Sequence, residues 1–166
     1  LSDCNNLNFY PELRSASLCV KLGEKHNLSA DNFLVTNGSD DALNTICATF
    51  LDPRDEVLIV APTYQHFEVF VQTRGARLRY FLPDDPFETE IDGLLAAAAR
   101  IRPRIIYLAN PNNPTGVVYT ADEIESLLLA HPKSLVIVDE AYSEFAGVTA
   151  RDLLHTYSNL VVTRTF

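Results

Sequence analysis

Short apolar runs alternate with helix-like segments along almost the whole chain, and this alternation restricts the fold more than any other feature. Runs of four to six residues predict strands over 32–36, 56–60, 77–82, 104–109, 135–138 and 160–163. Helical patterns cover 12–25, 39–51, 66–74, 91–100 and 151–155, and one more helix begins at Thr120. Alternating strands and helices are typical of a parallel sheet covered on both faces. The sequence therefore predicts a three-layer α/β/α sandwich around a mostly parallel sheet.

The size and composition are those of one globular domain. Of the 166 residues, 47% are apolar and 21% are charged, which is close to the globular average. We expect residues 1–11 to form a polar N-terminal segment and residues 12–166 to form part of one domain. The sequence lacks an initial Met and stops directly after a strand-like run, so we expect it to be a piece of a longer protein.

Charge and hydropathy argue against two kinds of partner. Thirteen Lys and Arg against 22 Asp and Glu give a net charge of −9, and an acidic surface repels the phosphates of nucleic acid. No apolar run approaches the roughly 18 residues of a membrane-spanning helix. We therefore expect neither a nucleic-acid partner nor a membrane partner.

The cysteines and histidines indicate a reducing compartment and no metal site. Cys19 and Cys47 lie in apolar helical patterns and are interpreted as reduced core thiols, whereas Cys4 leaves the cysteine count odd. This usage favours the cytoplasm. No CxxC pair is present and the four histidines lack the spacing of metal ligands.

Polar or aromatic residues follow five of the six predicted strands. Ligands of open parallel sheets bind beyond the carboxyl ends of the strands. The segments concerned are 37–40, 61–64, 110–116, 139–142 and 164–166. Either these groups converge in one cleft, or they are ordinary polar loops.

Three of these segments carry recognisable chemistry. Gly38 and Ser39 open a helix whose first N–H groups and dipole suit an anion, although an ordinary cap by Ser39 has the same pattern. Two prolines stiffen 110–116 and fix the amides of Asn110 and Asn113 for recognition of an oxygen. Asp139 ends a buried strand, where a carboxylate needs a cationic partner such as a pyridinium nitrogen, or else bonds loop amides.

Together these segments resemble the fold-type I pyridoxal-phosphate enzymes of the aminotransferase superfamily. The motifs that carry the resemblance are NFYPE (8–12), NGSDD (37–41), PTY (62–64), NPNNPTG (110–116), VDEAY (138–142) and VVTRTF (161–166). Within the superfamily the sequence is most similar to the histidinol-phosphate aminotransferases. The resemblance spans almost the whole chain and implies pyridoxal 5′-phosphate as the cofactor.

The resemblance also implies roles for individual residues. Asn113, Asp139 and Tyr142 match catalytic positions: Asp139 pairs with the ring nitrogen of the cofactor, and the other two bind its phenolic oxygen. Tyr64 matches the residue that stacks on the ring. The positions that contact the cofactor phosphate are matched by the amides of Ser39 and Asp40, by Thr165, and by Tyr10, which reaches the phosphate of a neighbouring subunit.

The lysine that forms the Schiff base in this family is missing from the sequence. By resemblance it would lie two positions past Phe166, and Lys21, Lys25 and Lys133 are not placed to replace it. The arginine that binds the substrate carboxylate and the small domain are also missing, and Arg164 is not expected to be that arginine. We therefore expect about half of an enzyme, inactive by itself.

The predicted activity of the whole protein is amino transfer between an amino acid such as glutamate and an oxo acid or a phosphorylated ketone. The resemblance also implies a homodimer. Two alternatives remain open, a pyridoxal-phosphate-dependent decarboxylase or lyase of the same fold and a non-catalytic remnant of it. The sequence lacks the GxSxG, GxGxxG and GxxxxGK[ST] motifs, which argues against α/β-hydrolases and against dinucleotide-binding and Walker-type sites.

Overall fold

The computed structural model describes residues 8–165, which divide into two compact units at Asn37 and Gly38. Cys4 and the last residue of the 161–166 motif therefore lie outside the described residues. In the N-terminal unit, the 3-10 turn η1 (Leu13–Ser15) precedes helix α1 (Ala16–His26), and η2 (Ala30–Asn32) follows. The predicted helix over 12–25 is thus interrupted, because Arg14 and Ser15 have φ values of 59° and 48°, which no α-helix accommodates.

The strand predicted over 32–36 is wrong. Asn32 ends η2, and residues 33–36 belong to no regular element. Among the described residues, no strand pairs with this segment, and Leu34 is 67% exposed. An apolar run becomes a strand only where a neighbouring strand satisfies its backbone groups, and apolarity alone does not supply that neighbour.

The C-terminal unit is built on one sheet of five parallel strands. Their order across the sheet is β2-β1-β3-β4-β5, and all four pairings are parallel. The strands are β1 (Glu56–Val60), β2 (Arg77–Phe81), β3 (Ile105–Ala109), β4 (Leu135–Asp139) and β5 (Leu160–Thr163). Their bounds agree with the predicted runs to within one residue, and the predicted parallel sheet is confirmed.

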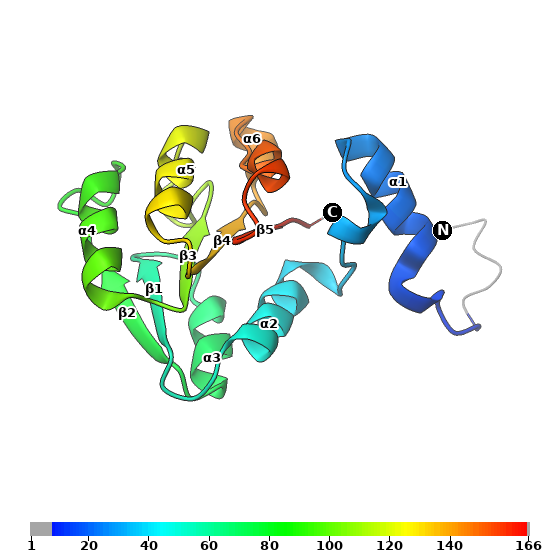
Figure 1. Cartoon of the computed structure of the whole chain (residues 1–166), viewed down its shortest axis with the longest axis horizontal. Helices are drawn as coiled ribbons and strands as arrows, with labels where there is room; N and C mark the ends of the chain where they lie inside the picture. The colour runs from blue at the N-terminus through cyan, green and yellow to red at the C-terminus, as the bar shows by residue number, and fades with distance from the viewer. Residues whose placement is uncertain (1–7, 166) are drawn as a thin grey trace. The chain divides into compact units, whose positions relative to one another are not determined.

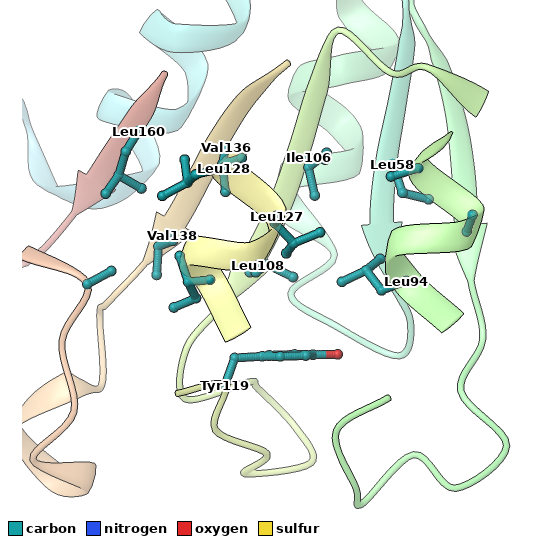
Figure 2. Close-up of a cluster of buried hydrophobic side chains, with 14 residues drawn as sticks. Leu58, Leu94, Ile106, Leu108, Tyr119, Leu127, Leu128, Val136, Val138 and Leu160 are labelled. Carbon is teal, nitrogen blue, oxygen red and sulfur yellow. The ribbon is translucent and has the colours of Figure 1, made fainter. Parts of the chain in front are cut away.

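Helices cover both faces of this sheet, as predicted (Figure 1). Helices α2 (Gly38–Phe50) and α3 (His66–Thr73) lie on one face, and α4 (Ile91–Ile101) and α5 (Ala121–Ala130) lie on the other. Successive residues of each strand contribute to opposite cores. Figure 2 shows the core under α4 and α5, where Leu94 and Leu127 pack over Leu58, Ile106 and Val136 of the strands.

Two short helices follow β4. The turn α6 (Ser143–Ala146) was not predicted, because four residues carry no periodic pattern. The helix predicted over 151–155 is the 3-10 helix η3 (Arg151–His155). Among the described residues, no helix is both long and apolar enough to cross a membrane.

Helix α5, predicted to begin at Thr120, starts with a capping box that provides a test of local stability. The Thr120 hydroxyl accepts a bond from the Glu123 amide at 3.3 Å, and the Glu123 carboxylate accepts one from the Thr120 amide at 2.8 Å. Thr120→Ala should lower the free energy of unfolding by about 1 kcal/mol, because the Glu123 amide loses its acceptor, the Thr120 hydroxyl. Urea denaturation measures this loss. Thr120→Ser should retain most of the stability, and an equal loss in both variants would contradict a capping role.

The strand order creates a crevice at the carboxyl ends of β1 and β3. The chain leaves β1 toward β2 through α3, then returns past β1 to β3 through α4 on the opposite face. Such a reversal of direction is where ligands of doubly wound sheets bind. The predicted site residues that follow β1 and β3 therefore lie at this edge.

Candidate active site

The Asn112 side chain joins the segments that follow β1 and β3. The Thr63 hydroxyl donates to the Asn112 amide oxygen at 2.7 Å, and the Asn112 amide nitrogen donates to the Pro62 carbonyl at 2.9 Å and to the Thr115 hydroxyl at 2.7 Å. Asn112 thus shapes the crevice, a role that the prediction did not assign. The sequence of 110–116 contains three asparagines and does not indicate which of them binds the segment that follows β1.

The other two asparagines of this loop differ in whether their side-chain amides are already hydrogen-bonded within the protein. The Asn110 amide is fully buried and pairs in both directions with the backbone of Tyr119, at 2.8 and 2.9 Å. Asn110, to which the resemblance assigned no role, thus uses its amide to hold the backbone of the loop. Asn113 is half-buried, and its amide makes no hydrogen bond to any other residue of the described part of the chain. Asn113 is the amide of this loop that can bind a ligand.

Tyr64 connects the end of β1 to the first turn of α2. Its hydroxyl donates to a carboxylate oxygen of Asp40 at 2.9 Å and lies 3.2 Å from Nδ1 of His66. Desolvation and the Asp40 carboxylate raise the pKa of Tyr64 to about 12, and the charges of Asp139 and Tyr142 add to this effect. These four predicted residues therefore lie within electrostatic range of one another. His66 is an addition that the sequence did not single out.

The start of α2 differs slightly from the prediction. The helix begins at Gly38, so Ser39 lies inside the first turn and is not its N-cap. Gly38 has φ +78°, which favours glycine, although a Cβ there would meet no atom within 4 Å. The amides of Ser39 and Asp40 belong to the first turn, where N–H groups lack acceptors within the helix and the dipole favours an anion.

Asp139 is a buried carboxylate held by two hydroxyl groups. Only 6% of the residue is exposed. Tyr107 donates to Oδ2 at 3.0 Å and Thr163 donates to Oδ1 at 2.9 Å. Burial raises the pKa of Asp139, and the hydrogen bonds from Thr163 and Tyr107 oppose that rise. Within residues 8–165 Asp139 has no ion pair, so its charge lacks the cationic partner expected for a buried carboxylate.

Tyr107 and Thr163 were not predicted as site residues. Both lie in strands whose apolar sequence indicates only burial. The alternation of side chains along a strand could have identified them. Ala109, Asp139 and Thr163 are aligned across β3, β4 and β5. Tyr107 is two residues before Ala109, so its side chain is on the same face of the sheet. A polar side chain on that face near the strand ends is a candidate partner of Asp139.

Three further predicted residues are exposed. Tyr142 follows β4, is 48% exposed and forms no hydrogen bond through its hydroxyl with the rest of the described chain. Thr165 lies two residues beyond β5 and is exposed. Tyr10 is fully exposed and belongs to the N-terminal unit, separate from the unit that contains the other predicted residues.

The Arg164 side chain binds other side chains of this protein. Its guanidinium contacts the Glu140 carboxylate at 2.6 Å and donates to the Thr149 hydroxyl at 3.0 Å. Glu140 also accepts bonds from the Thr149 hydroxyl and from the Ala150 amide. This agrees with the expectation that Arg164 is not the arginine that binds substrate. The described residues contain no group of His, Cys, Asp and Glu placed to hold a metal ion.

The chain belongs to the family of class I and II aminotransferases, whose family model matches residues 1–166. It is 38% identical over 162 residues to a dihydroxyacetone phosphate transaminase of Campylobacter jejuni, covering 97% of this chain and 44% of that protein. It is 36% identical over 162 residues to the histidinol-phosphate aminotransferase of Ruminiclostridium cellulolyticum, covering 96% and 45%.

A solved structure agrees with this assignment. The histidinol-phosphate aminotransferase of Sinorhizobium meliloti in complex with pyridoxal-5′-phosphate superimposes with a TM-score of 0.86 at 28% identity. The match covers 95% of this chain and 44% of that one. The chain thus has the fold of these enzymes and spans less than half the length of the relatives that it matches.

Proposed function

We propose that this chain is the cofactor-binding part of a pyridoxal-phosphate-dependent aminotransferase similar to the histidinol-phosphate aminotransferases. The observation that carries the proposal is Asp139, a buried carboxylate at the carboxyl end of the sheet. Its donors are all neutral, the hydroxyls of Tyr107 and Thr163 and the amide of Ala141, and no cation lies beside it within the described residues. A protonated pyridine nitrogen supplies the missing charge. The residue range 12–166 is accordingly proposed as part of the large domain, with the Schiff-base lysine and the small domain in other parts of the protein.

The other groups at this edge fit the remainder of the cofactor. Asn113 and Tyr142 carry polar groups that make no hydrogen bond to described residues, so both can bind the phenolic oxygen. Tyr64 provides an aromatic ring within electrostatic range of Asp139 and Tyr142. For the phosphate we propose the amides of Ser39 and Asp40 and the exposed hydroxyl of Thr165. Tyr10 is proposed to reach the phosphate in a second subunit, which makes the protein a homodimer.

The bound cofactor supplies an electron-accepting ring, and the residues of this chain hold that ring in its active state. Asp139 would keep a proton on the ring nitrogen, because its carboxylate is buried and its oxygens are held by Tyr107 and Thr163. Tyr64 would stack on the ring, and Asn113 and Tyr142 would help to orient it by binding its phenolic oxygen. In this proposal the chain would bind and polarise the cofactor through these residues.

The proposed substrates are an amino acid such as glutamate and a phosphorylated ketone or oxo acid. Two relatives support a phosphorylated partner, since one is named for dihydroxyacetone phosphate and the other for histidinol phosphate. A role in histidine biosynthesis follows if histidinol phosphate is the natural substrate. We propose a cytoplasmic location, in keeping with the buried free thiols of Cys19 and Cys47.

Amine transfer by the full-length protein tests this proposal against its alternatives. With pyridoxal phosphate and glutamate, addition of a phosphorylated ketone should yield 2-oxoglutarate in equal amount to the new amine. A decarboxylase would instead release carbon dioxide from an amino acid without forming an oxo acid. Cofactor binding with neither product would indicate a non-catalytic remnant. Binding of pyridoxal phosphate is measured by absorbance and by fluorescence. Failure to bind it would refute the proposed function.

A further inference from the structure

Asp139 is held from both sides by strands that flank its own. Tyr107 belongs to β3 and Thr163 to β5, and each donates to a different oxygen of the carboxylate, at 3.0 and 2.9 Å. Thr163 is directly opposite Asp139 in the ladder, whereas Tyr107 is two residues before the partner of Asp139 on β3. The Tyr107 side chain therefore reaches the carboxylate along the diagonal, as a long side chain can on one sheet face.

Tyr107 is itself rigidly placed. The residue is fully buried, and its ring stacks on Phe67 of α3 with centroids 4.0 Å apart and an angle of 14° between the ring planes. Phe67 is also fully buried, in the core between the sheet and helices α2 and α3. Because a close-packed core holds an aromatic ring in one rotamer, the hydroxyl has one position available. That position is at Oδ2 of Asp139.

The electrostatics of the contact fix the direction of this bond. Burial and the charge of Asp139 both raise the pKa of Tyr107, so the phenol stays protonated and donates throughout the working pH range. The bond lowers the pKa of Asp139, while burial, as the largest effect, and the more distant Asp40 carboxylate raise it. Tyr107 thus favours the ionised form of the acid, which burial alone disfavours.

Resting on the proposed function, we propose that Tyr107 is a positioning residue that fixes the Asp139 carboxylate toward the cofactor ring nitrogen and keeps it ionised, with Phe67 holding the phenol in place. Thr163 is the second donor of the same arrangement. The contact joins the α3 core to the acid of the site. Tyr107 and Phe67 lie in none of the sequence motifs, and Thr163 lies in the 161–166 motif but was assigned no role there.

Tyr107→Phe tests this inference, because it removes the hydroxyl and retains the ring that stacks on Phe67. The matched control is Tyr119→Phe, which alters a buried tyrosine of the opposite core that does not contact Asp139. Two quantities are measured on the protein: the titration of Asp139 without cofactor, by carbon-13 NMR of labelled aspartate assigned with Asp139→Asn, and the Kd for pyridoxal phosphate, by fluorescence.

In Tyr107→Phe the titration midpoint of Asp139 should move to higher pH, and the Kd should rise about tenfold, as for loss of one hydrogen bond to a charged group. Tyr119→Phe should change neither quantity. In an Asp139→Asn background the Tyr107 substitution should have little further effect on the Kd, because Tyr107 acts through the carboxylate.

The positioning role would be overturned if Tyr107→Phe left the titration midpoint of Asp139 where it is in the original protein. It would also be overturned if Tyr107→Phe raised the Kd equally in the original protein and in the Asp139→Asn background. Both outcomes would count even if the original protein binds the cofactor. Conversely, an unchanged protein that fails to bind pyridoxal phosphate would refute the proposed function, and the NMR titration would still decide whether Tyr107 controls the ionisation of Asp139.

Discussion

Asp139→Asn is expected to reduce amino transfer by the full-length enzyme by about 100- to 1,000-fold, the usual effect of removing one preorganised electrostatic partner. The amide has nearly the size of the carboxylate but carries no charge, so it cannot hold a proton on the ring nitrogen. Steady-state rates at saturating pyridoxal phosphate measure the loss. Saturation matters because weaker cofactor binding by itself would also lower the rate.

Stability separates this effect from misfolding. Burial raises the pKa of Asp139, so the ionised carboxylate costs folding free energy as the pH rises through that pKa. Removing the charge should therefore leave the free energy of unfolding at neutral pH within about 1 kcal/mol of the original. Asp84→Asn, at an exposed loop position, is the matched control for activity. Near-normal turnover of Asp139→Asn would remove Asp139 from the mechanism.

Arg164→Met is expected to lower the free energy of unfolding by about 3 kcal/mol, near the lower end of the range for breaking a buried ion pair. The Glu140 side chain is fully buried and that of Arg164 is 32% exposed. Without the guanidinium, Glu140 keeps the Thr149 hydroxyl and the Ala150 amide as donors but has no compensating charge. Urea denaturation of the variant measures the loss.

Two further variants isolate the reason for that loss. Arg151→Met removes an exposed pair with Asp152, and should cost less than about 1 kcal/mol. Glu140→Gln combined with Arg164→Met removes the unpaired charge and should recover part of the stability of Arg164→Met. Equal losses in the two arginine variants would show that the burial of Glu140 has no special effect.

The sheet was largely predictable because each of its strands is a short apolar run flanked by polar residues. The bounds of β1 and β5 were predicted to the residue. The same reasoning failed at 32–36, where the local pattern is similar but the described residues supply no paired strand. Periodicity reports which residues prefer burial, whereas a strand also needs a partner that lies far away in the sequence.

The candidate site was predictable where chemistry follows a strand end directly, as for Asp139 and Tyr64. Its supporting residues were not. Tyr107 is one apolar-looking residue inside a buried strand, and only the pairing of β3 with β4 brings its hydroxyl to Asp139. Likewise, the three asparagines of 110–116 are equivalent as sequence, and only the folded loop separates the structural Asn110 and Asn112 from Asn113.

The acid at the strand ends is oriented by hydroxyl groups from β3 and β5, on either side of β4. A chain in which only one of these neighbours has docked lacks half of that support. Competence to receive the vitamin B6 ring therefore requires that β3 and β5 are both paired with β4.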